Sequence, residues 1–376
     1  MRERIEPAFD LCAVLGERPQ PAVLRRLRLG GAALRRVVEL AIANQMRGAL
    51  WLALCRHGVL APLPDAVRAR LPENHAVRVL EEGWRCDRGR AGLMEAAALG
   101  LAEALGAQGI EAMFLKGMAL VLGGQAGEAG TRWMVDIDLL VQAPCVDRAV
   151  ETLRALGYQG GGPGHAPHHL EPMALPGGLW AAEIHFAPVE PVLAPALPAD
   201  SMWRDSVPCM ADGVGFRVPG PEDALLHNAL HAQESEFVYA LCQIPFRRLA
   251  DFARIAAAAG DGVDWEALRA RAARAARAAA FEAHLYQAHR LFGLPWMLKR
   301  PPSPRVRLHW ALCLAVLAWP WPVARLLLTR VELRRIFGNA AIGRSRVGAL
   351  SAGLRLAFRL AMKYRWRLLA RLAGPR

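Results

Sequence analysis

Hydrophobic and polar residues follow a helical spacing over the first part of the chain. Apolar positions recur three and four residues apart, for example at Leu34 and Val38, which predicts amphipathic helices. Prolines interrupt this pattern between residues 62 and 72, and another helix is predicted over residues 86–108. Residues 1–95 are therefore expected to form an N-terminal helical region.

The pattern changes after residue 110, where short apolar runs alternate with helical segments. Such runs, bounded by glycine, proline and polar residues, are typical of buried strands. The expected order is a strand over 112–115, a short helix over 118–122, a strand over 135–141, a helix over 146–156 and two strands flanking the turn at 176–178, the second ending at residue 186. This order favours a small mixed sheet with helices on one face.

A third stretch, from Pro221 onward, returns to helical spacing. Proline at the first position, followed by the acids Glu222 and Asp223, is a common helix start. The predicted fold is α+β, with a small mixed-sheet core in residues 96–220 between helical flanks. Residues 221–300 are expected to form a helical domain that completes a cleft, and residues 301–376 a basic helical tail.

The net charge of +13 is concentrated at the C-terminus. Residues 325–376 contain thirteen basic residues and one acid, so the rest of the chain is close to neutral. No aromatic-plus-basic pattern accompanies the core, which makes nucleic acid an unlikely partner. The seven cysteines are widely spaced and form no CxxC pair, as expected in a reducing compartment. A cytoplasmic location is predicted, because the N-terminus lacks an apolar signal-peptide run.

One segment raises the question of a membrane. Residues 308–324 carry no charge apart from His309, but Pro320 and Pro322 interrupt a stretch at the lower limit for a span. A buried helix is the favoured reading. Peripheral contact of this stretch and the arginine-rich tail with a lipid surface is an alternative, since basic helices bind anionic lipids.

The candidate chemistry begins with the segment VDIDLLV. Alternation along a strand points Asp136 and Asp138 to one face and Ile137 to the other. Two carboxylates side by side above an apolar layer repel each other unless a cation lies between them. Hard divalent ions such as Mg²⁺ take these oxygen ligands, often together with substrate phosphates.

A later strand, AAEIHF, repeats this arrangement. Glu183 and His185 share one face, and Ile184 takes the other. If the two strands are neighbours, Glu183 joins the aspartates as a third carboxylate. Three acids around two metal ions suit an in-line phosphoryl displacement.

Lys116 and Gly117 end the first predicted strand and could hold a phosphate. Glycine permits close approach of the backbone, and the following helix directs its N–H groups to the same place. The ammonium of Lys116 would balance phosphate charge, and Arg132, four residues before Asp136, could reach the same phosphates.

Together, LKG, TRWMVDIDLLV and AAEIHF resemble an uncharacterised bacterial nucleotidyltransferase-like family of the DNA polymerase β superfamily, and PEDALLHNALHA and RRLADFARI resemble its later helices. The resemblance covers about residues 95–255. It implies that Asp136, Asp138 and Glu183 are metal ligands and catalytic residues, and that Gly117 belongs to the phosphate turn. His185 and Asp251 are candidate supporting residues.

Several residues also have plain structural interpretations. Asp136 and Asp138 could be solvated acids at a strand end, Glu183 a surface ion-pair partner, and Lys116 an ordinary strand-end lysine. Arg132 could pair with a nearby acid, and Asp251 could fix its helix to Arg247 or Arg248. The histidines at 165, 168 and 169 lack cysteine partners at zinc spacing. His227 and His231, four apart on a helix, are expected to line the cleft or pack between helices.

The leading hypothesis is a Mg²⁺- or Mn²⁺-dependent enzyme that moves an NMP group from an NTP to an unknown small-molecule or protein acceptor. One departure favours an alternative. Gly117 is followed by Met118, where many superfamily members have a serine that touches phosphate. The alternative is an inactive nucleotide-binding or regulatory accessory protein of a biosynthetic cluster, with membrane association as a further variant.

Overall fold

The structure, a computed structural model, describes residues 2–16, 19–28, 31–60, 74–163 and 167–320. The arginine-rich part of the predicted tail and His165 lie outside these residues. Within the described residues, no helix is both long and apolar enough to cross a lipid bilayer.

Helices precede, interrupt and follow a single five-stranded sheet. The first helices are α1 (Arg2–Leu15), α2 (Pro21–Arg28), α3 (Gly31–Ala43), α4 (Arg47–Arg56) and α6 (Asn74–Ala107). The sheet region contains β1 (Met113–Phe114), α7 (Lys116–Leu122), β2 (Asp136–Leu140), α8 (Val146–Ala155), β3 (Ala181–His185), α9 (Ala199–Arg204), β4 (Val207–Ala211) and β5 (Val214–Val218). The later helices are α10 (Pro221–Leu230), α11 (Phe246–Ala259), α12 (Trp265–Arg274), α13 (Ala278–Phe292) and α14 (Pro304–Ala318).

The strand order is β3-β2-β1-β5-β4. Strand β2 runs parallel to β3 and antiparallel to β1, whereas β1 runs parallel to β5, so the sheet is mixed. The predicted α+β fold, a small mixed sheet flanked by helices, is confirmed.

Three local predictions differ from the structure. The hairpin predicted around residues 176–178 is reduced to isolated bridges, such as Met173 to Ala182, because β3 pairs mainly with β2. The β4–β5 hairpin was not predicted, although Asp212 and Gly213, both with positive φ, form its tight turn. Helix α6 begins at Asn74 rather than near residue 86 and runs through residue 95 without a break.

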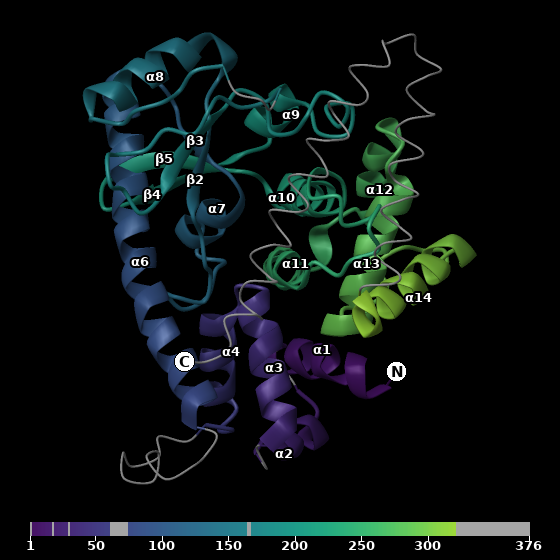
Figure 1. Cartoon of the computed structure of the whole chain (residues 1–376). Coiled ribbons are helices and arrows are strands. Elements are labelled where there is room, and N and C mark those ends of the chain that lie inside the picture. Colours follow the sequence, from purple (N-terminus) through teal and green to yellow (C-terminus); the bar gives the residue numbers. More distant parts are fainter. Residues whose placement is uncertain (1, 17–18, 29–30, 61–73, 164–166, 321–376) are drawn as a thin grey trace, which may run out of the picture.

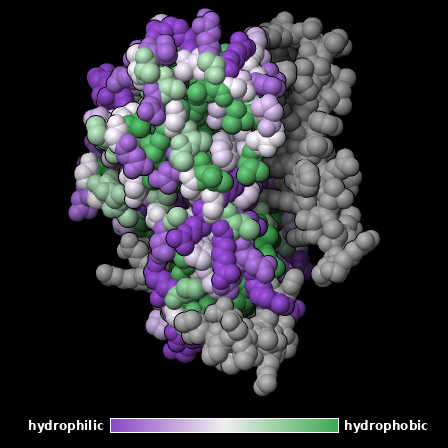
Figure 2. All heavy atoms as spheres, turned by 90° about the vertical axis from the view of Figure 1, so that its left-hand side faces the viewer, coloured by the Kyte–Doolittle hydropathy of each residue, from purple (hydrophilic) through white to green (hydrophobic). Residues whose placement is uncertain are grey.

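Two hydrophobic cores meet at the sheet. Ile137 and Leu139 of β2 enter a core formed with α6 and α8, while Leu140 belongs to a second core shared by the N-terminal helices and the helices after residue 220. Figure 1 shows α6 running along one side of the molecule, from the N-terminal helices to the sheet and α8. Figure 2 faces that side and shows hydrophobic residues interspersed with hydrophilic ones. Such a mixture is normal for a solvent-facing surface.

A buried ion pair joins the loop before β2 to helix α11. The Arg132 Nε atom lies 2.9 Å from Asp251 Oδ2 of α11, and both side chains are almost fully buried. Next to it, the Trp133 ring is flanked by the guanidinium groups of Arg47 and Arg90, at 5.4 and 4.8 Å from its centroid. These contacts fix the loop before β2 against the surrounding helices.

We expect Asp251→Asn to lower the free energy of unfolding by about 3–5 kcal/mol, because it leaves the Arg132 guanidinium buried without its counter-charge. Urea unfolding followed by circular dichroism measures this loss. Asp205→Asn, which breaks the exposed pair with Arg204, is the matched control and should change stability little. A loss for Asp251→Asn as small as that of the control would contradict this assignment.

Candidate functional site

The acidic residues lie on two adjacent strands, β2 and β3, which run parallel. In the β2–β3 register, Asp138 is opposite Glu183. Ile137 and Ile184 are in the sheet core, so Asp138, Glu183 and His185 lie on the other face, towards the helices. The strand alternation therefore brings two carboxylates and an imidazole together.

Asp138, Glu183 and His185 form one compact group of metal-ligand atoms. Each offers one atom, and these atoms lie within 4.8 Å of one another. The His185 Nε2 atom lies 2.9 Å from Asp138 Oδ1 and 3.7 Å from Glu183 Oε2. His185 is fully buried, Asp138 nearly so, and Glu183 retains 18% of its side-chain exposure, so the group opens to solvent at Glu183.

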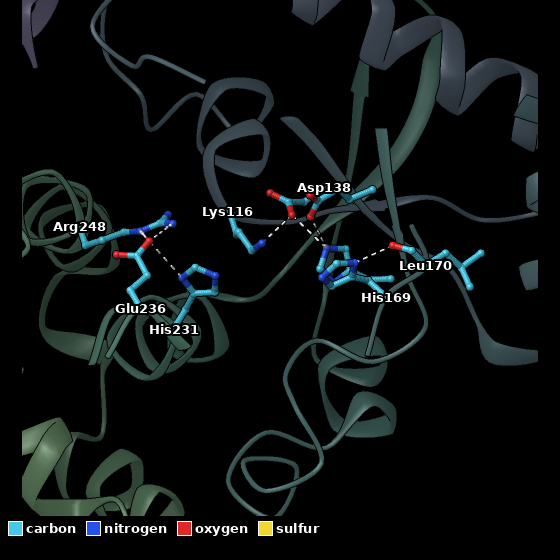
Figure 3. Close-up of polar contacts among 9 residues, drawn as sticks. Lys116, Asp138, His169, Leu170, His231, Glu236 and Arg248 are labelled. Atoms are coloured by element: carbon cyan, nitrogen blue, oxygen red, sulfur yellow. Dashed lines mark hydrogen bonds and ion pairs between the residues drawn. The ribbon is translucent and has the colours of Figure 1, made fainter. Parts of the chain in front are cut away.

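Lys116 supplies a positive charge to the same carboxylate. Its Nζ atom lies 2.6 Å from Asp138 Oδ1, so this oxygen accepts hydrogen bonds from both Lys116 and His185. Figure 3 shows Lys116 between this group and a second set of polar residues on the helices. Lys116 is thus the link between the sheet side and the helical side of the site.

The pKa shifts follow from burial and from these contacts. Burial opposes ionisation of Asp138, but Lys116 and His185 together hold the pKa of its carboxyl well below the ordinary value of 3.8. Burial likewise opposes the charged forms of Lys116 and His185, yet Asp138 raises the pKa of both. Since the pKa of Asp138 is lower in the folded state, its contribution to stability is present above pH 3.8 and is lost as the pH falls through its folded value.

Asp136 occupies the more exposed start of β2 and lies outside the compact group. Burial and the neighbouring charge of Asp138 raise the pKa of its carboxyl. Lys116 and Arg248 offset this effect only in part, and an added cation would lower the pKa further. The structure thus brings Asp138 and Glu183 together and leaves Asp136 beside them.

Lys116 and Gly117 form the first turn of α7 rather than a separate turn before it. Lys116 has a φ of 50°, an uncommon backbone conformation for a residue with a side chain. Such strain is often found at functional sites. A Cβ atom at Gly117 would lie 2.6 Å from the Met134 sulfur, so a larger residue here would force the Met134 side chain in the loop before β2 to move.

The structure places Arg132 away from the open part of the site. Its guanidinium is held by Asp251 and donates a 2.9 Å hydrogen bond to the Trp133 carbonyl. Burial lowers the pKa of Arg132, and Asp251 only partly offsets this effect. The suggested pairing of Asp251 with Arg247 or Arg248 was wrong, because its partners are Arg132 and, at 3.7 Å, Arg254.

The helical side of the site is formed by the end of α10 and the start of α11. Arg248 Nη2 lies 2.9 Å from Glu236 Oε1, which is also 3.7 Å from His231 Nδ1 (Figure 3). His231 begins a π-helical turn over His231–Ser235, a helix irregularity that recurs at functional sites. His227, one turn earlier, is buried.

Arg248 and Glu236 were not predicted as site residues. The pair of arginines at 247–248 was noted only as a partner for Asp251, and Glu236 follows the irregular turn that α-helical spacing does not predict. The sequence therefore contained a weak indication that Arg248 belongs to the site and no indication for Glu236.

The histidine-rich loop lies against the buried imidazole. The ring centroids of His168 and His169 are 5.5 and 4.9 Å from that of His185. His169 Nδ1 is 2.7 Å from the Leu170 carbonyl oxygen. Within the described part of the chain, neither residue belongs to a group that could hold a metal ion. Their role here is to cover His185.

One of three comparisons with known proteins finds a match. No curated protein and no solved structure matches the chain. The family model described as an uncharacterised nucleotidyltransferase matches residues 31–293, which include all the site residues named above and most of the helices around them. The chain therefore belongs to this uncharacterised nucleotidyltransferase family.

Proposed function

We propose that the protein transfers a nucleoside monophosphate from an NTP to an acceptor hydroxyl or similar group. The bond between the α-phosphorus and its bridging oxygen breaks, a bond from the acceptor oxygen to the α-phosphorus forms, and pyrophosphate leaves. The observation that carries this proposal is the convergence of Asp138, Glu183 and His185, with Lys116 on the same carboxylate. The family membership supports the transfer of a nucleotidyl group.

The donor set fits a divalent cation. Two carboxylates suit Mg²⁺, and an imidazole adds affinity for Mn²⁺ and other transition ions. Asp138, Glu183 and His185 would hold the ion, and Asp136 would share a second one with the substrate. Bound there, the ion would neutralise phosphate charge and lower the pKa of an attacking hydroxyl.

The protein's own residues would then position the nucleotide. Lys116 would exchange Asp138 for a phosphate oxygen, and the Gly117 amide, at the start of α7, would donate to the same phosphate. Arg132 would act mainly by fixing the loop that carries Asp136, because Asp251 already engages its guanidinium. Asp251 is thus a positioning residue in this scheme.

A nucleotide-binding protein without turnover is the second candidate. Met118 stands where a phosphate-binding serine is common, and the ammonium of Lys116 is already engaged by Asp138. Nucleotide binding without pyrophosphate release would favour this candidate. Peripheral membrane contact remains a prediction about the tail, and the acceptor is a small molecule or protein still to be identified.

We expect label transfer from α-phosphate-labelled NTPs to a component of cell extract with Mg²⁺ or Mn²⁺. The variants Asp138→Asn and Glu183→Gln, and the double variant Asp136→Asn/Asp138→Asn, should lose about 100-fold or more, since each removes charge that would hold the cation. Asp147→Asn, on the exposed start of α8, is the control and should retain transfer. Equal labelling by the wild type and the double variant would remove the catalytic proposal.

Metal binding can be measured without any nucleotide. Electron paramagnetic resonance of free Mn²⁺ should show a site on the wild type, and His185→Asn should weaken it about tenfold or more by removing a ligand. His289→Asn, on α13, controls for loss of an imidazole away from the sheet. Unchanged Mn²⁺ affinity in His185→Asn would exclude this imidazole from the metal site.

A further inference from the structure

A small cavity lies beside Lys116, on the side facing the helices. It has a volume of about 40 Å³ and is lined by residues of α7, α10 and α11, among them Lys116, His227, Asn228 and Arg248. In Figure 3, Lys116 lies between Asp138 on one side and His231 and Arg248 on the other. The cavity therefore adjoins the proposed metal group through one side chain.

Five buried side-chain atoms in this lining have no hydrogen-bond partner among the described residues: His227 Nε2, Asn228 Oδ1, His231 Nδ1 and both carboxylate oxygens of Asp251. Asp251 is ion-paired with Arg132 and Arg254, and His231 Nδ1 lies 3.7 Å from Glu236, whereas His227 Nε2 and Asn228 Oδ1 have no such partner. His227 as a whole is only 3% exposed. Buried polar groups are nearly always satisfied, so these two atoms on one cavity indicate a polar ligand. Rotation of the Asn228 amide presents its NH₂ group at the same position.

The charges around the cavity favour an anion. Lys116 and Arg248 line it with side chains that are only 14% and 11% exposed. The acid in the lining, Asp251, is already paired with Arg132 and Arg254. Among the described residues, the neighbouring Arg247 donates hydrogen bonds to Gln45 Oε1 and to the Trp133 carbonyl. Burial, and then the nearby charges of Arg132 and Arg248, lower the pKa of Arg247 to about 9.

His227 is suited to bind an anion as a neutral donor. Burial, reinforced by the charge of Lys116, lowers the pKa of its imidazole to about 3. A neutral imidazole carries one N–H group and can donate it to an oxygen. It does so without adding a further buried charge beside Lys116 and Arg248.

The size of the cavity restricts the ligand further. A volume of about 40 Å³ holds roughly three water molecules, which matches the oxygens of one phosphoryl group and excludes a nucleobase. Because Lys116 contacts Asp138 as well as the cavity, a phosphate here would lie next to the proposed metal group. The phosphates beyond the α-phosphorus of an NTP would meet this geometry.

We propose that this cavity binds one terminal phosphoryl group of the NTP, and the same end of the pyrophosphate formed from it, through His227, Asn228, Lys116 and Arg248. This inference rests on the proposed function for the identity of the nucleotide. Nothing in it depends on turnover, because an anion site can be occupied by pyrophosphate alone.

The test is calorimetric titration of the full chain with inorganic pyrophosphate without divalent ions. Two variants change the lining: His227→Gln removes the imidazole, and Asn228→Asp introduces a negative charge with almost no change of shape. Both should bind pyrophosphate at least about tenfold more weakly, the size expected for one hydrogen bond to a charged group. The Mn²⁺ affinity of His227→Gln should stay within about twofold of wild type, because His227 supplies no ligand atom to the metal group and the substitution changes no charge.

His284→Gln is the matched control, since His284 is equally buried, also has an unpartnered Nε2 atom and does not line the cavity. If His227→Gln fails to fold, Asn228→Asp decides alone. Wild-type affinity in Asn228→Asp, or no pyrophosphate binding by the wild type, would overturn the proposal. If the variants bind pyrophosphate more weakly but the wild type transfers no label, the anion site stands and the transferase proposal fails. The two failures are therefore distinguishable.

Discussion

The site depends on one buried carboxylate oxygen. Asp138 Oδ1 accepts from Lys116 Nζ at 2.6 Å and lies 2.9 Å from His185 Nε2, in surroundings from which water is almost excluded. Removing either hydrogen-bond donor would leave a carboxylate charge that the protein interior solvates poorly. An added cation would have to displace Lys116 or His185 from this oxygen, but it would meet a carboxylate that burial has already desolvated.

The fold holds this oxygen where its two cores meet. Strand β2 presents Ile137 and Leu139 to the core beneath α6 and α8, so Asp138 must face the helices on the other side. The pair Arg132–Asp251 ties the start of this strand to α11, which also supplies Arg248. The sheet provides the group that could hold a metal ion, and the helices provide the positive and neutral groups opposite it.

Much of this arrangement could be predicted from the sequence, since strands have a two-residue period. In DID and EIH the alternation of acids and apolar residues was enough to place Asp138, Glu183 and His185 on one face, and the register then aligned them. Lys116 and Gly117 were identified from their position after an apolar run. The structure adds the close approach of Met134 to Gly117.

The remainder depends on contacts between distant parts of the chain or on helix irregularity. The pairing of Arg132 with Asp251 cannot be read from spacing, because many arginines were available to that acid. The π-helical turn at His231 shifts the residues after it, so α-helical periodicity could not predict the place of Glu236. The β4–β5 hairpin, in contrast, had a readable signal in Asp212-Gly213.

The central claim is that the Asp138 group holds a cation against the phosphates of a nucleotide. A crystal structure with Mn²⁺ and a non-hydrolysable NTP analogue, using anomalous scattering to locate the metal, tests it directly. The account predicts an anomalous peak bound by Asp138, Glu183 and His185, with Lys116 moved from Asp138 to a phosphate oxygen. A nucleotide bound elsewhere, with Lys116 still on Asp138 and no peak beside Glu183, would contradict it.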